Sequence, residues 1–296
     1  MFKVGVIGLG DMGSGLAKNL IKNNFSTWGY DLSKERMDYF SSIGGNTTSS
    51  VQEVAKNVEA IFVMVMNGHQ VNEIIFGDKG LVNNLAENSV IILTSTIKPH
   101  EAKEIGEKIK TTRIHIIDSP VSGGYPGAQS GTLTLMCAGN HNIINKYKEV
   151  LRSVAKDIHI VGTESGQGQT IKACLQALQG SILATLFEVS TLAAKAGLKG
   201  QTVYDVFSTS GAGCGIVKTA LENIIDRKFT KTGSHISTMH KDLTIALDMA
   251  TKNGVPLHMA STAMQLFEAA KTKFPEGDNW IITKLVEEIV GAELHR

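Results

Sequence analysis

The sequence has few of the features that mark several large classes of protein. It holds only three cysteines and five prolines, and 29 basic residues against 28 acidic ones leave a net charge of +1. Without a basic excess there is no support for a nucleic-acid or membrane-surface partner, so we expect a small molecule as the partner. The prolines mark no flexible linker, and the sequence shows no repeat or low-complexity segment.

The few cysteines and the short apolar runs indicate an intracellular protein. Cys137, Cys174 and Cys214 are odd in number and lack metal-ligand spacing, which fits a reducing compartment and three small buried side chains. The nine histidines form no HExxH or similar pattern, so no metal site is predicted. Residues 1–7 are too short an apolar run for a signal peptide, and no apolar stretch is predicted to span a bilayer. We expect a cytoplasmic protein.

The most informative segment is the glycine-rich turn at residues 8–13, which reads Gly-Leu-Gly-Asp-Met-Gly. It follows an apolar strand at 3–7 and precedes a helix-forming run at 14–21. In that setting G-x-G-x-x-G forms a tight turn whose backbone N–H groups, together with the helix dipole, hold a dinucleotide pyrophosphate. The alternative is a glycine-rich turn that binds nothing. The predicted cofactor contacts in this turn are Gly8, Leu9, Gly10, Asp11 and Met12.

The next predicted strand, residues 26–30, ends at Asp31, eighteen residues after Gly13. A carboxylate at this place accepts hydrogen bonds from the 2′-hydroxyl of an adenosine ribose and repels a 2′-phosphate. The sequence therefore predicts NAD as the cofactor, in preference to NADP.

The pattern along the chain predicts an α/β fold, a Rossmann doubly wound sheet followed by an all-α domain. Residues 1–162 form the predicted NAD-binding domain and residues 163–296 the predicted substrate and oligomerisation domain. Strands are expected at 3–7, 26–30, 60–64, 90–93, 115–117, 132–138 and 158–161, between amphipathic helices. Helices are expected at 167–196, 201–207, 216–225, 234–252 and 261–271, the first joining the two domains and lining the cleft between them.

Lys172 is the most telling single residue for chemistry. Most lysines are solvated surface charges, but the neighbours Ile171, Ala173, Cys174 and Leu175 indicate a largely buried helix. A lysine in that place is expected to line a cavity, where desolvation lowers an ammonium pKa and allows general acid or base work. Gln176 follows one turn later on the same face.

Three further segments are candidates with competing interpretations. The hydroxyls of residues 94–96 follow a strand and could bind a ligand, or cap the helix that begins near residue 99. The segment 118–124 could offer a carboxylate-binding nest of backbone N–H groups, or be a bend needed by geometry alone. Lys241 and Asp242 could lie near the nicotinamide, or be an exposed pair on an amphipathic helix.

Four motifs, in this order, resemble the β-hydroxyacid dehydrogenases, a family that includes 3-hydroxyisobutyrate, tartronate semialdehyde and threonate dehydrogenases. The motifs are residues 8–13, 119–124, 168–172 and 241–243. The resemblance covers essentially the whole chain. It implies a Rossmann domain joined by a long helix to an all-helical domain, NAD-linked oxidation of a 3-hydroxy acid, and a homodimer or homotetramer.

The resemblance also implies a role for individual positions. Lys172 matches the family's catalytic lysine and Lys241 a lysine beside the bound cofactor. The substrate-carboxylate loop corresponds to Ser122, Gly123 and Gly124, and further cofactor contacts to Val65, Met66 and Thr96.

Two positions depart from the common family pattern. Gln176 stands where many members have asparagine, and Gly211-Ala212-Gly213 continues as Cys214-Gly215. Both places are expected near the substrate. Gln176, together with residues 256–263, resembles the threonate branch, which acts on four-carbon sugar acids. The alternatives are a 3-hydroxyisobutyrate dehydrogenase, a tartronate semialdehyde reductase, or a non-catalytic NAD-binding module.

Overall fold

The protein, described here from a computed structural model that covers residues 2–296, folds as two compact units. The N-terminal unit extends to Lys172, and the C-terminal unit is Ala173–Arg296. The division predicted from the sequence lies after residue 162, so the first ten residues beyond it belong by their contacts to the N-terminal unit.

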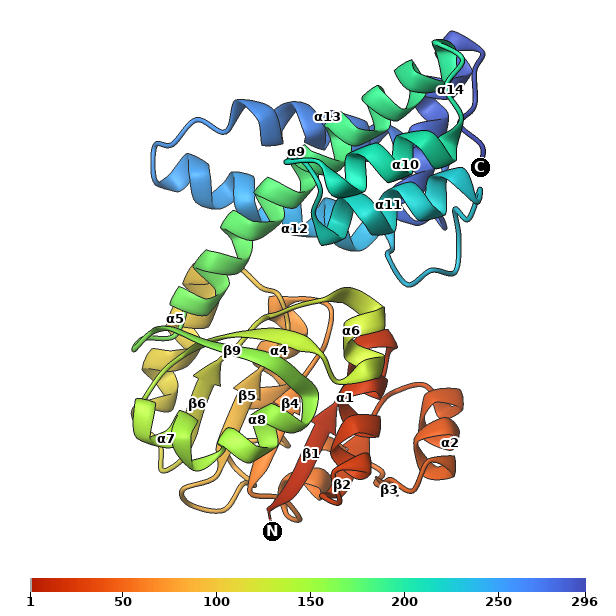
Figure 1. The fold of residues 1–296 in the computed structure, drawn as a ribbon. Helices are drawn as coiled ribbons and strands as arrows, with labels where there is room; N and C mark the ends of the chain where they lie inside the picture. The colour runs from red at the N-terminus through yellow and green to blue at the C-terminus, as the bar shows by residue number, and fades with distance from the viewer. Residues whose placement is uncertain (1) are drawn as a thin grey trace. The chain divides into compact units, whose positions relative to one another are not determined.

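Within the described residues the N-terminal unit has a nine-stranded sheet with the order β3-β2-β1-β4-β5-β6-β8-β7, and β9 pairs with β8 (Figure 1). The strands are β1 (Lys3–Ile7), β2 (Ser26–Tyr30), β3 (Asn46–Thr47), β4 (Ala60–Val63), β5 (Val90–Leu93), β6 (His115–Asp118), β7 (Val121–Ser122), β8 (Leu133–Ala138) and β9 (Ala155–Gly162). The strands β1 to β6 are parallel, β8 is antiparallel to β6 and β7, and β9 is parallel to β8.

Helices cover both faces of this sheet. They are α1 (Asp11–Lys22), α2 (Lys34–Ser42), α3 (Val51–Ala55), α4 (Gly68–Phe76), α5 (Pro99–Ile109), α6 (Gly124–Ser130), α7 (His141–Lys146) and α8 (Lys148–Val154). Alternate side chains of one strand enter different cores: Phe62 packs in the cluster that holds Leu16 of α1, and Ile61 in the cluster that holds Ile105 of α5. This two-sided burial explains why the central strands are continuous apolar runs.

The C-terminal unit is helical. Its elements are the remainder of α9 (Gln167–Lys195), then α10 (Gly200–Thr209), α11 (Gly215–Ile225), α12 (Ile236–Lys252), α13 (His258–Lys273), the 3₁₀ helix η1 (Asn279–Ile282) and α14 (Thr283–Val290). Phe187, Leu221, Leu243, Phe267 and Trp280 meet in one core, so each long helix supplies an apolar stripe to it.

The predicted fold class is confirmed: a Rossmann sheet is followed by an all-helical part. Each predicted strand and helix has a counterpart in the structure. The two-residue strands β3 and β7 and the elements η1 and α14 were not predicted. The strand β8 lies where a strand was predicted, but the expectation of a parallel sheet is wrong for it, because residue patterns do not encode strand direction.

The prediction that no apolar stretch could span a bilayer is wrong if length and composition alone are considered. The 29-residue helix α9 is long and apolar enough to cross a membrane. However, it carries the buried polar side chains of Gln176, Ser190 and Thr191, and Leu183 and Phe187 pack in the helical core. We therefore interpret α9 as the core helix of the C-terminal unit.

Candidate active site

The turn after β1 has the geometry that a phosphate cradle needs. Gly8 has φ +88°, and a Cβ there would lie 2.1 Å from the backbone oxygen of Met64. A Cβ on Gly13 would lie 1.8 Å from the oxygen of Gly8, so the helix packs on the turn only because that position is glycine. At Gly10 the nearest neighbour of an added Cβ is Arg36, at 3.6 Å. This face of the turn is open to a ligand, and it begins α1, so the residues fit a pyrophosphate.

The Asp31 carboxylate lies at the end of β2 and braces the same turn. Its Oδ2 accepts the backbone N–H of Leu9 at 2.7 Å, and its Oδ1 accepts that of Ser33 at 2.8 Å. Arg36, whose position the sequence interpretation did not consider, places its Nη1 3.4 Å from Oδ2. A carboxylate has about four lone-pair sites, so these contacts leave acceptor capacity for ribose hydroxyls.

A cavity of about 420 Å³ lies at the end of β2, and Asp31 is part of its lining. Its other walls come from α2 and from residues 47 and 48. Among the predicted site residues, Asp31 alone lines it.

The ends of β4 and β5 meet beside this turn, and the structure shows what the Ser95 hydroxyl does there. Ser95 does not cap α5: its hydroxyl donates to the Val63 oxygen at 3.1 Å and accepts the N–H of Val65 at 2.8 Å. The cap is made instead by Glu101, which accepts the N–H of Lys98 at 2.9 Å. Ser95 thus joins the two strand ends that carry the predicted cofactor contacts, which are Val65, the 56% exposed Met66 and the half-buried Thr96.

The predicted carboxylate loop leaves β7 through two residues with left-handed backbone. Ser122 pairs with Thr134 of β8, and Gly123 and Gly124 have φ values of +121° and +57°. A Cβ on Gly124 would meet nothing nearer than Pro126, at 3.8 Å. The bend requires glycine and is open on one side, which is compatible with either interpretation, so the carboxylate role stays a prediction.

Lys172 is buried, with 7% of its surface exposed, in the second turn of α9. The expectation of a largely buried helix is wrong for one of its faces, because Ile171 is 44% exposed and Cys174 is exposed. Positions 171, 174 and 178 lie on one face at helical spacing, while Lys172, Ala173 and Gln176 turn inward. The prediction of three buried cysteines is correct only for Cys137.

The start of α9 is held by a fully buried carboxylate that the sequence interpretation did not assign to the site. Asp118, the last residue of β6, accepts the N–H of Gly166 at 2.7 Å and that of Gln169 at 3.3 Å through Oδ2. Burial raises the pKa of the Asp118 carboxyl to about 6, against hydrogen bonds from Gln169, Gly166 and Gly168 that lower it. The sequence signal was present, since Asp118 directly precedes the motif at 119–124 and Gln169 stands within the motif at 168–172.

In the C-terminal unit two predicted site residues meet through a third. The Gln176 amide donates to Oδ2 of Asp242 at 2.6 Å, and Nζ of Lys241 lies 3.2 Å from Oδ1. Asp242 is 3% exposed and Lys241 has 28% of its side chain exposed, which excludes the alternative of an exposed pair and leaves the cofactor role of Lys241 a prediction. The structure joins Gln176 and Lys241 in one polar cluster on α9 and α12.

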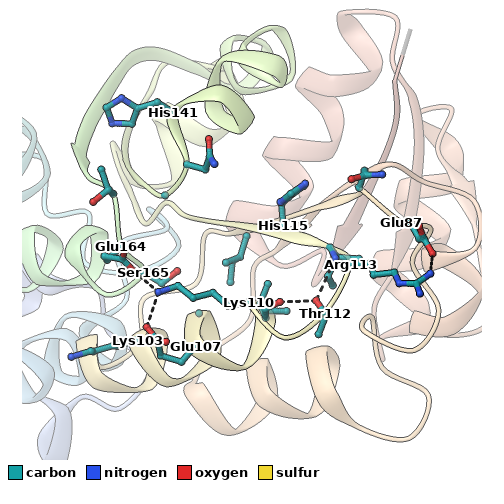
Figure 2. Close-up of a pocket in the computed structure, with 18 residues that line it drawn as sticks. Glu87, Lys103, Glu107, Lys110, Thr112, Arg113, His115, His141, Glu164 and Ser165 are labelled. Carbon is teal, nitrogen blue, oxygen red and sulfur yellow. Dashed lines mark hydrogen bonds and ion pairs between the residues drawn. The ribbon is translucent and has the colours of Figure 1, made fainter.

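A second cavity lies away from these residues. It measures about 780 Å³, and none of the predicted site residues lines it. Figure 2 shows its wall, where Lys110 pairs with both Glu107 and Glu164, and Arg113 pairs with Glu87. Each acidic side chain here has a basic partner, so the wall offers no excess of either charge to a ligand. Within residues 2–296 no group of three or more His, Cys, Asp or Glu side chains could hold a metal ion.

Comparison with known proteins supports the class that this fold and site define. Residues 3–162 match the NAD binding domain of 6-phosphogluconate dehydrogenase, and residues 166–286 match the NAD-binding domain of NADP-dependent 3-hydroxyisobutyrate dehydrogenase. The L-threonate dehydrogenase of Escherichia coli K12 is 31% identical over 91% of this chain and 89% of its own. The 2-(hydroxymethyl)glutarate dehydrogenase of Eubacterium barkeri is 29% identical over 99% and 97%.

A solved structure extends the likeness to three dimensions. The 3-hydroxyisobutyrate dehydrogenase of Salmonella typhimurium superposes with a TM-score of 0.88 and is 30% identical, over 96% of this chain and 100% of its own. The fold and the site define a nicotinamide-dependent oxidoreductase. The chain belongs to the β-hydroxyacid dehydrogenase family, and it is an NAD-dependent dehydrogenase of that family.

Proposed function

We propose that this enzyme oxidises a four-carbon sugar acid, with L-threonate as the first candidate, and uses NAD in preference to NADP. The observation that carries the chemistry is the burial of Lys172 on a helix turn that is fixed to the carboxyl ends of β5 and β6. In open α/β sheets, ligands bind beyond those strand ends. A lysine amine in such a position can exchange a proton with a substrate hydroxyl.

Cofactor binding is assigned to the turn and the strand ends of the N-terminal unit. The open face at Gly10 takes the pyrophosphate, Asp31 takes the ribose hydroxyls, and Val65, Met66 and Thr96 line the remainder. When bound, NAD accepts the hydride that leaves the substrate carbon. The negative charge of Asp31 disfavours a 2′-phosphate, and the neighbouring Arg36 is already directed at that carboxylate.

The groups that hold the substrate come from the loop after β7 and from helix α9. The backbone at Ser122, Gly123 and Gly124 receives the carboxylate. Lys172, as the neutral amine, hydrogen-bonds the hydroxyl and takes its proton while the carbon loses hydride. Gln176 follows one helical turn later and orients the hydroxyl, with its own amide fixed by Asp242.

The substrate class rests on Gln176 and on the similarity to L-threonate dehydrogenases. An amide on a longer side chain than asparagine can reach an additional hydroxyl of a polyol acid. The L-threonate dehydrogenase of Pectobacterium atrosepticum is 31% identical over 97% of this chain. The competing substrates are 3-hydroxyisobutyrate, which has a methyl branch, and tartronate semialdehyde, which would be reduced.

The test is NADH formation with L-threonate, D-erythronate, 3-hydroxyisobutyrate, D-glycerate and L-serine, each with NAD and with NADP. Lys172→Ala is expected to lower kcat by about 10²- to 10⁴-fold and to leave NADH affinity unchanged, because the amine acts in proton transfer. Lys195→Ala is the matched control on the same helix, where Nζ bonds only the Val290 oxygen among the contacts described. Equal activity of wild type and Lys172→Ala would refute the assignment.

The remaining properties follow the family expectation. We propose a homodimer or homotetramer in the cytoplasm, which sedimentation of the purified protein and fractionation of its source would test. A protein that binds NADH and turns over no substrate of the panel would favour the non-catalytic NAD-binding module.

A further inference from the structure

A hydrogen-bonded pair of buried side chains, Asp118 and Gln169, links the parts of the proposed site that come from different strands. Asp118 has no exposed surface and Gln169 is 1% exposed. Besides the two backbone N–H groups at the start of α9, Asp118 accepts the Gln169 amide through Oδ1 at 2.9 Å. The carboxylate therefore ties the end of β6 to the first turn of the helix that carries Lys172.

Gln169 passes the connection on to the segment around Thr96. Its Nε2 also donates to the Ser95 oxygen at 3.0 Å, and its Oε1 accepts the N–H of Ile97 at 3.0 Å. The two backbone groups lie on either side of Thr96. The orientation of the amide is fixed at both ends, because turning it over would set Nε2 against the Ile97 N–H and Oε1 against the Ser95 oxygen.

The first residues of α9 pack closely against the surrounding backbone. A Cβ on Gly168 would lie 2.7 Å from the Met136 oxygen and 2.8 Å from the Asp118 oxygen. A Cβ on Gly166, which has φ +97°, would lie 2.7 Å from the Pro99 oxygen. Lys172 follows Gln169 by three residues, so it is carried on the turn that these contacts fix.

A helix start needs no distant buried carboxylate for its own sake. A serine or asparagine just before the helix satisfies the same N–H groups locally, and such caps are common. Burying an ionised carboxylate is unfavourable by comparison, and it is retained here at the centre of a fully hydrogen-bonded network. The connection from β6 to the Thr96 segment is what a local cap would not supply.

We propose that Asp118 and Gln169 are positioning residues, which hold Lys172, the Thr96 segment and the loop after β6 in one register for hydride transfer. This inference rests on the proposed function. It assigns to the two side chains an effect on kcat that acts through Lys172, without contact with substrate or cofactor.

The test compares Asp118→Asn with wild type in three measurements. Asparagine keeps the shape but turns an amide donor toward the Gln169 donor, and Gln169 cannot turn over. The expected result is a fall in kcat of about 10²-fold, since a misplaced catalytic group loses that much, with the NADH Kd unchanged. Hydrogen exchange is expected to increase in the peptide that covers residues 163–175 and to stay unchanged over residues 3–22.

A double variant provides rescue. In Asp118→Asn with Gln169→Glu, the new amide donates to the new carboxylate, which still accepts the Ile97 N–H. The Ser95 oxygen loses its donor and faces a carboxylate oxygen instead, so the rescue is expected to be partial. This variant is expected to regain at least about tenfold in kcat over Asp118→Asn. Should Asp118→Asn not fold, Gln169→Ala takes its place, and there the NADH Kd is expected to rise as well, because both bonds beside Thr96 are lost.

Tyr147→Phe is the control for loss of stability alone. The Tyr147 hydroxyl bonds the Glu59 and Asn88 oxygens, at the opposite ends of β4 and β5. It is expected to lower Tm and leave kcat unchanged. The proposal is overturned if Asp118→Asn keeps kcat within about twofold, or if kcat falls with unchanged exchange over residues 163–175. Exchange that changes as expected in a protein inactive on all hydroxy acids would refute the proposed function and leave the anchoring intact.

Discussion

The buried carboxyl of Asp118 predicts an unusual pH dependence of stability. Its pKa is raised from the usual 3.8 to about 6 in the folded protein. Between these two values the folded state binds a proton that the unfolded state does not. The contribution to the free energy of unfolding is therefore greatest at low pH and is lost as the pH rises through about 6.

The size of the effect follows from the shift. A rise from 3.8 to about 6 corresponds to about 3 kcal/mol in full. Only part of this change in the free energy of unfolding falls within the pH range in which unfolding can be measured. On going from about pH 7.5 to about pH 5, wild type is expected to gain roughly 1 kcal/mol relative to Asp118→Asn, which cannot take up this proton.

The assay is urea unfolding at both pH values, followed by tryptophan fluorescence. The chain has two tryptophans, Trp28 in the N-terminal unit and Trp280 in the C-terminal unit. A Trp280→Phe background leaves Trp28 as the reporter for the unit that holds Asp118. In the same background Tyr147→Phe should lower stability equally at both pH values, because it removes no carboxyl group.

Two outcomes would refute the reasoning. Parallel pH dependences of wild type and Asp118→Asn would mean that the carboxyl does not titrate in this range. A gain of wild type over the variant as the pH rises would mean that hydrogen bonds and the dipole of the 29-residue helix outweigh desolvation.

Two further predictions concern packing. Gly13→Ala is expected to lower both Tm and NADH affinity, because its Cβ would strike the Gly8 oxygen. Gly10→Ala, whose Cβ would make only an ordinary contact with Arg36 at 3.6 Å, should weaken NADH binding by more than about tenfold at unchanged Tm. Equal Tm values for the two variants would contradict this. Arg227 donates to both oxygens of the buried Glu287 carboxylate, at 2.6 and 2.7 Å. Arg227→Met removes this partner and is expected to destabilise the C-terminal unit by about 3 kcal/mol in urea unfolding. A loss below about 1 kcal/mol would show that the carboxylate finds other partners or water.

Much of the fold could be predicted because its elements have local signals. The strands β1, β2 and β5 begin and end where predicted. The glycine turn after β1 has the spacing that is typical of a strand-turn-helix unit. The antiparallel direction of β8 and the presence of the two-residue strands had no local signal, since strand pairing is decided by neighbours that are distant in sequence. Helix α9 was predicted from its helix formers, and its exposed face was not recognised because Ile171 and Cys174 are apolar.

The site was predicted least well where residues act through one another. Lys172 stood out because a buried lysine is rare, whereas Asp118 and Gln169 are 51 positions apart and meet only when the sheet has formed. Likewise, the sequence left open whether Lys241 and Asp242 are an exposed pair, because it does not show that Gln176 of α9 bonds to Asp242.

The boundary between the two units falls between Lys172 and Gln176 on a single unbroken helix. The rise of an α-helix sets these residues about 6 Å apart along its axis. An exchange of the C-terminal unit between relatives would therefore replace the residue proposed to select the substrate and keep the proposed base. Such a division would let substrate range diversify by recombination while the chemical step is inherited intact.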